Sequence, residues 1–184
     1  MPSSPAPIVG VYAPVAGTID ANRSRDFDRL RDKHLVIPVV GVPPERIEDT
    51  FKDGRDGGER VHNAIDILAP RNTPIVAADD GVILRMSSNA LGGITIFAAD
   101  TDRRFVYYYA HLDHYDGSAY AGRKLTKGDT IGYVGTTGNA PKDVPHLHFQ
   151  IMRWPADGKY SIGEPINPYP FLHVPRDSSG VRKR

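Results

Sequence analysis

Histidines and an aspartate occur in three short segments of this chain, and side chains of these types can bind a metal ion. The first segment holds His62 and Asp66, four residues apart. On a straight strand they would share a face but lie about 13 Å apart, too far to hold one ion. A metal pair therefore requires a bend that returns His62 toward Asp66. Without that bend, the two are a surface histidine and an exposed aspartate.

The second segment is His146-Leu-His148. Alternation along a strand places both imidazoles on one face, about 7 Å apart at the backbone. Such a pair can bind one metal jointly, or divide into a ligand and a neighbouring acid or base. The third segment ends an aromatic run with His111, which on its own indicates no particular chemistry. The remaining histidines are interpreted as background: His34, His114 and His173.

The three segments together predict a catalytic zinc site. The chain has no cysteine, so zinc must be held by His, Asp or Glu. Catalytic zinc sites commonly use three protein ligands and leave the fourth position to water. His62, Asp66 and one histidine of the His146/His148 pair satisfy that number, and we expect one Zn²⁺ per chain. The other histidines could orient the water, transfer a proton or stabilise the oxyanion.

Composition indicates a globular protein without an obvious nucleic-acid or membrane partner. The 184 residues, 40% hydrophobic and 24% charged, fit one domain with an extension. A net charge of +1 gives no reason to expect nucleic acid or an anionic membrane as partner. We expect a monomer without a transmembrane segment, because no run approaches the roughly 18–20 apolar residues required. The start lacks a signal-peptide pattern, so either the protein stays in the cytoplasm or its leader lies outside this sequence.

From residue 61 onward the pattern changes to short β-rich runs. Their spacing of roughly 10 residues favours an antiparallel sheet over βαβ units. The triplet Asp79-Asp80-Gly81 predicts a tight hairpin between the first two runs, and DTDR predicts another turn between the third and fourth. The predicted strands cover 74–78, 81–86, 92–99, 104–112, 129–135 and 145–153.

The flanking regions are predicted to be less regular. An N-terminal extension covers 1–60, a catalytic domain 61–172 and a flexible basic tail 173–184. Within the extension we expect a loosely docked arm over residues 1–20 and a solvated helix over about 22–34. Residues 43–60 are expected to form a long connection.

Between Arg60 and Leu172, four motifs follow one another in a fixed order. They are RVHNAIDILAPRNTPIVAADDGVI, YYAHL, LTKGDTIGYVGTTGNAPKDVPHLHFQI and INPYPFL. Together they resemble the lysostaphin and LytM-type zinc endopeptidases of bacterial cell walls. The resemblance implies a mainly β fold, a compact antiparallel LytM-type domain (duplicated hybrid motif) with a groove over the metal. It also implies peptidoglycan peptides as substrates and a place in the bacterial cell envelope, periplasmic or exported.

The resemblance also implies a role for each candidate residue. By it, His62, Asp66 and His148 are the metal ligands, while His111 and His146 are catalytic histidines beside the attacking water. Three positions depart from the family pattern, and none of them is a ligand: Ala64, Asn72 and Gln150. Ala64 and Asn72 stand where glycine is usual; a left-handed backbone would cost alanine about 1–2 kcal/mol, whereas asparagine tolerates it better. Gln150 replaces a frequent glutamate and should share the strand face of His146 and His148.

Two functions follow from the resemblance. The first is a zinc-dependent endopeptidase that hydrolyses cross-links or stem peptides of peptidoglycan by a zinc-activated water. The second is a catalytically silent LytM-type domain that binds the wall or regulates another hydrolase. Silent relatives typically lack metal ligands, so the five retained positions favour the enzyme. A metallo-β-lactamase-like hydrolase is disfavoured, because no further Asp-His pair follows His146-Leu-His148.

Two kinds of bond are candidates for cleavage: a bond within a glycine cross-bridge and a direct D-alanyl–diaminopimelate link. The helix-like segment is a candidate for covering the groove in an inhibitory state. Loops 85–93, 113–123 and 136–144 are expected to border that groove. Substrate contacts are expected, by position alone, from Asn89, Tyr115 and Lys142.

Overall fold

The structure is a computed structural model that describes residues 16–173, and the chain divides into two units, 1–33 and 34–184. The first unit contains helix α1 (Ala16–Asp32). This helix begins earlier than the predicted residue 22, although Gly17, Thr18 and Asp20 in its first turns are weak helix formers and this part lacks the charged pattern. Shortly after it, His34 adopts a left-handed backbone with φ of 49°. The predicted arm is wrong for residues 16–20, and its remainder, like most of the predicted tail, lies outside the described residues.

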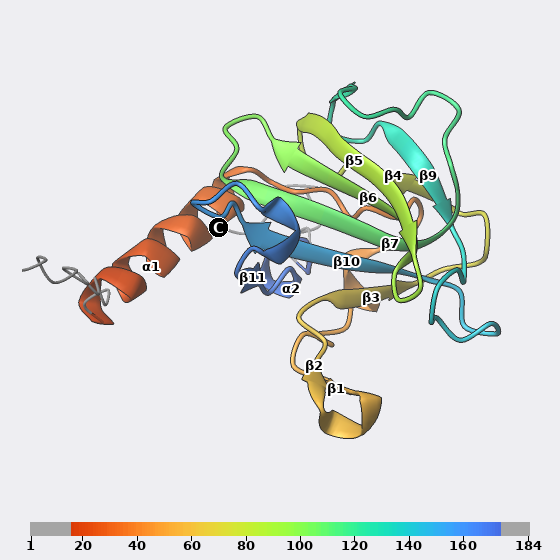
Figure 1. Ribbon diagram of the computed structural model, residues 1–184, viewed down its shortest axis with the longest axis horizontal. Coiled ribbons are helices and arrows are strands. Elements are labelled where there is room, and N and C mark those ends of the chain that lie inside the picture. The colour runs from red at the N-terminus through yellow and green to blue at the C-terminus, as the bar shows by residue number, and fades with distance from the viewer. Residues whose placement is uncertain (1–15, 174–184) are drawn as a thin grey trace, which may run out of the picture. The chain divides into compact units, whose positions relative to one another are not determined.

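The second unit is mainly β, as predicted. Its elements are β1 (Gly54–Arg55), β2 (Arg60–Val61), β3 (Ile65–Leu68), β4 (Pro74–Val76), β5 (Gly81–Asn89), β6 (Gly93–Asp100), β7 (Phe105–Tyr115), β8 (Lys124–Leu125), β9 (Thr130–Val134), β10 (His146–Arg153), β11 (Pro165–Ile166) and the short helix α2 (Tyr169–Leu172). Nine of these strands form one antiparallel sheet (Figure 1). Six of them lie side by side in the order β11-β10-β7-β6-β5-β8, and β3, β4 and β9 join the sheet outside this row. In addition, β3 pairs with β10, and β9 pairs with both β4 and β7.

The segment 43–60, predicted as a long connection, contains a small antiparallel hairpin. Strands β1 and β2 pair with Gly54 opposite Val61 and Arg55 opposite Arg60. Gly57 and Gly58 form the turn with φ of 73° and 98°, a conformation that glycine adopts at little cost. This hairpin extends from the chain just before β3 (Figure 1). The prediction failed here because the strands are only two residues long and carry no hydrophobic alternation.

The hairpin predicted at Asp79-Asp80-Gly81 is wrong. Strand β4 pairs with β9, and β5 pairs with β6 and β8. Both aspartates form hydrogen bonds with other parts of the chain. Asp79 accepts one from the Tyr107 hydroxyl at 2.9 Å, and Asp80 accepts one from the Lys127 amide at 2.7 Å. The turn between β6 and β7 does form a hairpin, with Ala99 opposite Val106.

The core lies on one face of β10 and leaves the other face for polar groups. Leu147, Phe149 and Ile151 are fully buried, and the ring of Phe149 packs against those of Tyr107 and Tyr109, with centroids 6.3 and 5.2 Å apart. Because side chains alternate along a strand, the opposite face presents the intervening residues. These are His146, His148 and Gln150. The packed face therefore fixes where the histidines point.

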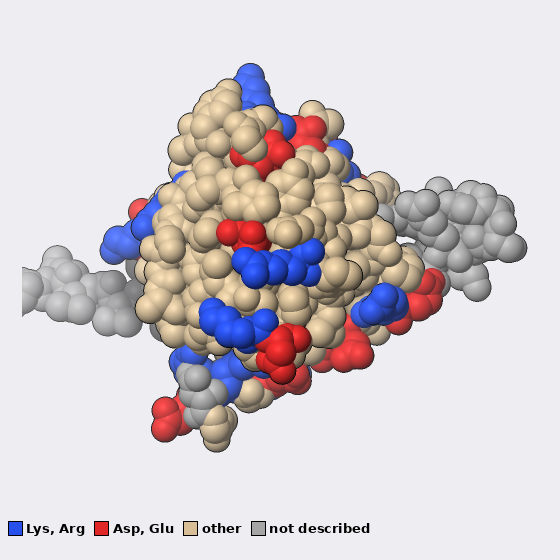
Figure 2. Space-filling model, turned by 90° about the vertical axis from the view of Figure 1, so that its right-hand side faces the viewer, with Lys and Arg blue, Asp and Glu red and all other residues tan. Residues whose placement is uncertain are grey.

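Charged side chains are scattered over the side of the molecule that Figure 2 shows. Lys and Arg lie among Asp and Glu there, and neither sign forms a large patch on that side. Within residues 16–173, no helix has the length and apolar character that crossing a membrane requires.

Candidate metal centre

Three potential ligand atoms converge on one point. Nε2 of His62 lies 2.9 Å from Nδ1 of His148 and 3.0 Å from Oδ1 of Asp66. The distance between Nδ1 of His148 and Oδ1 of Asp66 is 3.3 Å. Tetrahedral ligands bonded to zinc at about 2.0–2.1 Å are separated from one another by about 3.3 Å. The spacing of these three atoms therefore suits a shared ion.

The local backbone explains how these side chains meet. The predicted bend is present: Asn63, directly after His62, has a left-handed backbone with φ of 57°. Ala64 does not have a positive φ, so alanine in place of the usual glycine causes no backbone strain there. Asn72 does have a positive φ, of 68°. Asp66 lies on β3 directly opposite His148 on β10. The bend and this register bring residues distant in sequence to one place.

Thr50 contacts both members of the first pair. Nδ1 of His62 donates to the carbonyl oxygen of Thr50 at 2.9 Å, which leaves Nε2 of the neutral ring with its lone pair toward the site. The Thr50 hydroxyl accepts a hydrogen bond from the Asp66 amide at 3.1 Å. Arg55 donates to Oδ2 of Asp66, the carboxylate oxygen that faces away from the convergence point. No motif in the sequence indicated Thr50 or Arg55.

The other oxygen of Asp66 supports the metal interpretation most directly. Oδ1 is buried and has no hydrogen-bond partner among the described residues. Burial raises the pKa of Asp66, but the adjacent rings of His148 and His62 outweigh it and hold the pKa below its usual range. Burial also lowers the pKa of His148. A buried carboxylate oxygen facing imidazole lone pairs is unfavourable unless a cation lies between them, and two nitrogens with one oxygen suit zinc.

His111 and His146 form a second pair beside these three residues. Their ring centroids are 4.9 Å apart, and Nε2 of His146 lies 3.8 Å from Oδ1 of Asp66. Nδ1 of His146 contacts the carbonyl oxygen of Val144 at 2.8 Å, and Nδ1 of His111 contacts that of Thr137 at 2.8 Å. If each Nδ1 carries the proton, each Nε2 is free to accept one. Burial, with lesser effects from the neighbouring histidines, lowers the pKa of His111 to about 4, so this ring is neutral at pH 7.

A β-bulge directs His111 into the site. Strand β7 pairs with β10 as far as Ala110 and with β9 from Leu112, so His111 occupies the point where β7 changes partner. Its φ of 62° is unusual for a residue with a side chain. The Thr137 hydroxyl donates to the Leu112 carbonyl at 2.6 Å and accepts from the Ile94 amide at 2.9 Å, and these two residues pair with each other directly beside the bulge. Backbone of this kind persists only where the surroundings enforce it.

The two groups of residues line one cavity of about 1080 Å³. Gln150 lines it as well, on the predicted strand face. Residues of the predicted loops 85–93 and 136–144 contribute to the wall, but none of 113–123 does. The three expected substrate contacts, Asn89, Tyr115 and Lys142, do not line the cavity. Instead they bind backbone groups of Gly92, Ser87 and Thr136, respectively.

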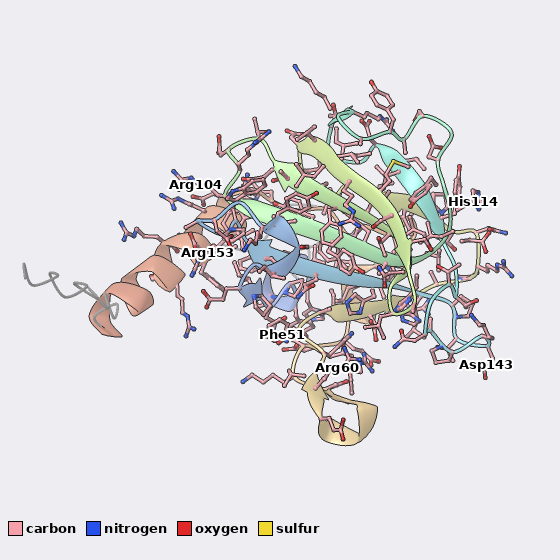
Figure 3. All side chains as sticks on the ribbon, in the orientation of Figure 1. Phe51, Arg60, Arg104, His114, Asp143 and Arg153 are labelled. Carbon is pink, nitrogen blue, oxygen red and sulfur yellow. The ribbon has the colours of Figure 1, made fainter. Side chains whose placement is uncertain are left out.

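The histidines interpreted as background lie outside this cavity. His114 stacks on Tyr133, with ring centroids 4.5 Å apart, at the outer end of β7 (Figure 3). His173 contacts the carbonyl oxygen of Pro44 through Nδ1 at 2.7 Å. Neither residue lines the cavity.

Comparison with known proteins identifies the same part of the chain. Residues 60–168 match the sequence profile of peptidase family M23. The L-Ala--D-Glu endopeptidase of Bacillus subtilis (strain 168) is 31% identical over 131 residues, which cover 68% of this chain and 39% of that protein. The solved structure of LytU is 33% identical with a TM-score of 0.58, over 68% of this chain and 83% of that one. The catalytic domain of the antimicrobial peptidase lysostaphin from Staphylococcus simulans is 31% identical with a TM-score of 0.55, over 65% and 83%.

Proposed function

The chain belongs to peptidase family M23, and we propose that it is an active zinc-dependent endopeptidase that cleaves peptide bonds of peptidoglycan. The observation that carries this proposal is the buried, unpartnered Oδ1 of Asp66, held 3.0 and 3.3 Å from ring nitrogens of His62 and His148. We assign these three residues as the zinc ligands. His111 and His146 are assigned as the catalytic pair.

The side chains around the site fit hydrolysis of an amide. Zinc, when bound, supplies Lewis acidity that polarises a carbonyl and makes water a nucleophile near neutral pH. His146, with Nδ1 held by the Val144 carbonyl, presents Nε2 to take a proton from the attacking water and deliver it to the leaving amine. His111, neutral at pH 7, orients the same water through its own Nε2. Thr50 and Arg55 keep the ligand side chains in place through their hydrogen bonds.

A silent wall-binding domain is the second candidate function. Binding to the wall requires only the groove, and it does not require five ionisable side chains to lie around one point. The convergence of all five on one cavity supports the enzyme instead. Turnover by the purified protein distinguishes the two functions.

We extend the proposal to the domain boundaries and to the place of action. Residues 61–172 would form the peptidase domain, with Thr50 and Arg55 of the preceding segment completing its site. Several relatives carry names of peptidoglycan peptidases, so we propose that this chain acts in the bacterial cell envelope. The chain spans only 39% and 24% of the length of two of these relatives, so their full activities are not transferred.

Purified peptidoglycan, with mass-spectrometric identification of released peptides, provides the test. We expect about one zinc per chain by elemental analysis, and new amine and carboxyl ends on digestion. Chelation should stop release and added zinc should restore it. Zinc-loaded protein that binds wall material but releases no peptide would support the silent domain and overturn the enzyme.

A further inference from the structure

Four exposed aliphatic side chains surround the candidate metal centre. Val61, Leu68, Leu91 and Val144 all line the cavity, with exposed fractions of 54%, 49%, 55% and 36%. They are half of the eight large hydrophobic residues that are exposed within the described part of the chain. Exposed aliphatic groups that gather around a cavity, rather than scatter, indicate a surface that contacts an apolar part of a ligand. We call these four residues the alkyl frame.

Each member of the alkyl frame is held next to a residue of the site. Val61 directly precedes His62, and Leu68 lies opposite His146 in the β3–β10 ladder. The carbonyl oxygen of Val144 contacts Nδ1 of that same histidine at 2.8 Å. These backbone positions are therefore fixed by the same contacts that position the imidazoles.

Leu91 occupies the other wall in an equally fixed position. Its carbonyl accepts a hydrogen bond from the Asn139 amide at 3.0 Å, and the next residue, Gly92, accepts one from the His111 amide at 2.8 Å. The Leu91 amide in turn donates to the Asn89 side chain at 3.0 Å. The frame therefore flanks the proposed reacting centre on more than one side. The substrate residues next to the scissile bond would contact these sides.

The alkyl frame bears on the choice between a glycine bridge and a cross-link that contains alanine. A glycine bridge has no side chains, so it leaves the four alkyl groups in contact with water or backbone. An alanine residue presents a methyl group, and burying one such group strengthens binding by about four-fold. Discrimination in a well-fitted hydrophobic pocket can reach about ten-fold or more for one carbon.

We propose that the substrate carries alanine next to the scissile bond, in preference to glycine. This inference rests on the proposed function, because it concerns the same cavity. It assigns the alkyl frame as the specificity-determining surface and the stem-type peptide as the substrate class.

The test compares two cross-linked stem-peptide dimers that differ by one methyl group. One carries D-alanine at the cross-link, and the other carries glycine at that position. Binding of both is measured calorimetrically with the zinc-loaded His146→Ala variant, which avoids cleavage, and kcat/KM is measured with the unaltered protein. We expect the alanine dimer to be favoured about four- to ten-fold in both measurements.

Variants of the frame separate its effect from that of the site. Leu91→Ser and Val144→Ser should reduce the preference toward unity, whereas Tyr120→Ser, an exposed residue outside the cavity lining, should leave it unchanged. Equal binding, or a preference for the glycine dimer, overturns the inference. A binding preference for alanine without any turnover supports the inference and overturns the proposed enzyme, so the two failures are distinguishable.

Discussion

Thr137 contacts the ring of His111 through its backbone carbonyl, and through its hydroxyl it contacts Leu112, which lies beside the bulge in β7. Its backbone oxygen lies 2.8 Å from Nδ1 of His111, and its Oγ1 lies 2.6 Å from the Leu112 carbonyl oxygen. Replacing the hydroxyl therefore alters the support of the proposed catalytic imidazole of His111 without touching a proposed metal ligand. One residue therefore contacts both the His111 ring and the backbone next to the residue that carries it.

Thr137→Val should lower kcat by about 10- to 100-fold while zinc content stays unchanged, because the ring loses its fixed position. Thr137→Ser keeps the hydroxyl and should recover activity to within a few-fold of the unaltered protein. The measurement is kcat and KM on a cross-linked peptide, with zinc determined on the same sample. A loss of thermal stability in Thr137→Val with normal kcat would show a purely structural role.

His148→Ala should abolish zinc retention and activity, because it removes one of three ligands and leaves Asp66 with an unbalanced buried charge. Elemental analysis after dialysis checks this. His114→Ala is the matched control, since that histidine lies outside the cavity, and it should keep its zinc. Stoichiometric zinc in His148→Ala would rule out the ligand assignment.

His146→Ala and His111→Ala should each retain zinc and lose turnover by about 100-fold or more, the usual contribution of a positioned acid or base. Stopped assays at saturating substrate report kcat, and equilibrium dialysis reports metal affinity. A variant of either residue with wild-type kcat would remove that residue from the mechanism.

Thr50→Val should weaken zinc affinity by about 10- to 100-fold, because the hydroxyl that accepts the hydrogen bond of the Asp66 amide is lost. Thr50→Ser should restore affinity, since serine offers an acceptor at the same place. Competition with a chromophoric chelator measures the change. Equal affinities in the valine and serine variants would mean that the hydroxyl does not position the ligand.

Alkaline pH should unfold the protein through its buried tyrosines. Burial, and for Tyr107 also the charge of Asp79, raises the pKa of Tyr107 and Tyr109 above the usual value. Because the unfolded chain releases these protons near pH 10 and the folded chain holds them, their contribution to stability is complete below about pH 10. It is lost as pH rises further, at roughly 1.4 kcal/mol per pH unit for each residue.

Denaturant titrations between pH 8 and 12 measure this loss. Tyr109→Phe should reduce the slope of unfolding free energy against pH, and Tyr120→Phe, at an exposed position, serves as control. Tyrosinate absorbance that develops fully before unfolding would contradict the expectation.

Local patterns predicted much of the sheet but not all of its pairing. Alternation in β10 correctly placed His146 and His148 on one face, because the burial of Leu147 and Phe149 fixes the other. The Asp-Gly signal at residue 80 failed, since pairing of β4 with the distant β9 outweighs a local turn preference. Pairing partners far apart in sequence leave no trace in a short window.

The candidate site was incompletely predictable for a related reason. His62, Asp66 and His148 stand out by residue type, and the ordered motifs gave them roles. Thr50 and Thr137 act through backbone carbonyls and hydroxyls, which every threonine possesses. Only the three-dimensional arrangement distinguishes these two from the others.

The distance along the chain between His62 and His148 has a consequence for folding. The two residues are 86 positions apart, in a chain without cysteine, so an ion shared by both would be a cross-link in a protein that cannot form disulfides. An ion that binds the folded arrangement and not the unfolded chain would stabilise the fold through its binding free energy. Withdrawing the ion would then free a long segment of the chain as well as stop the chemistry.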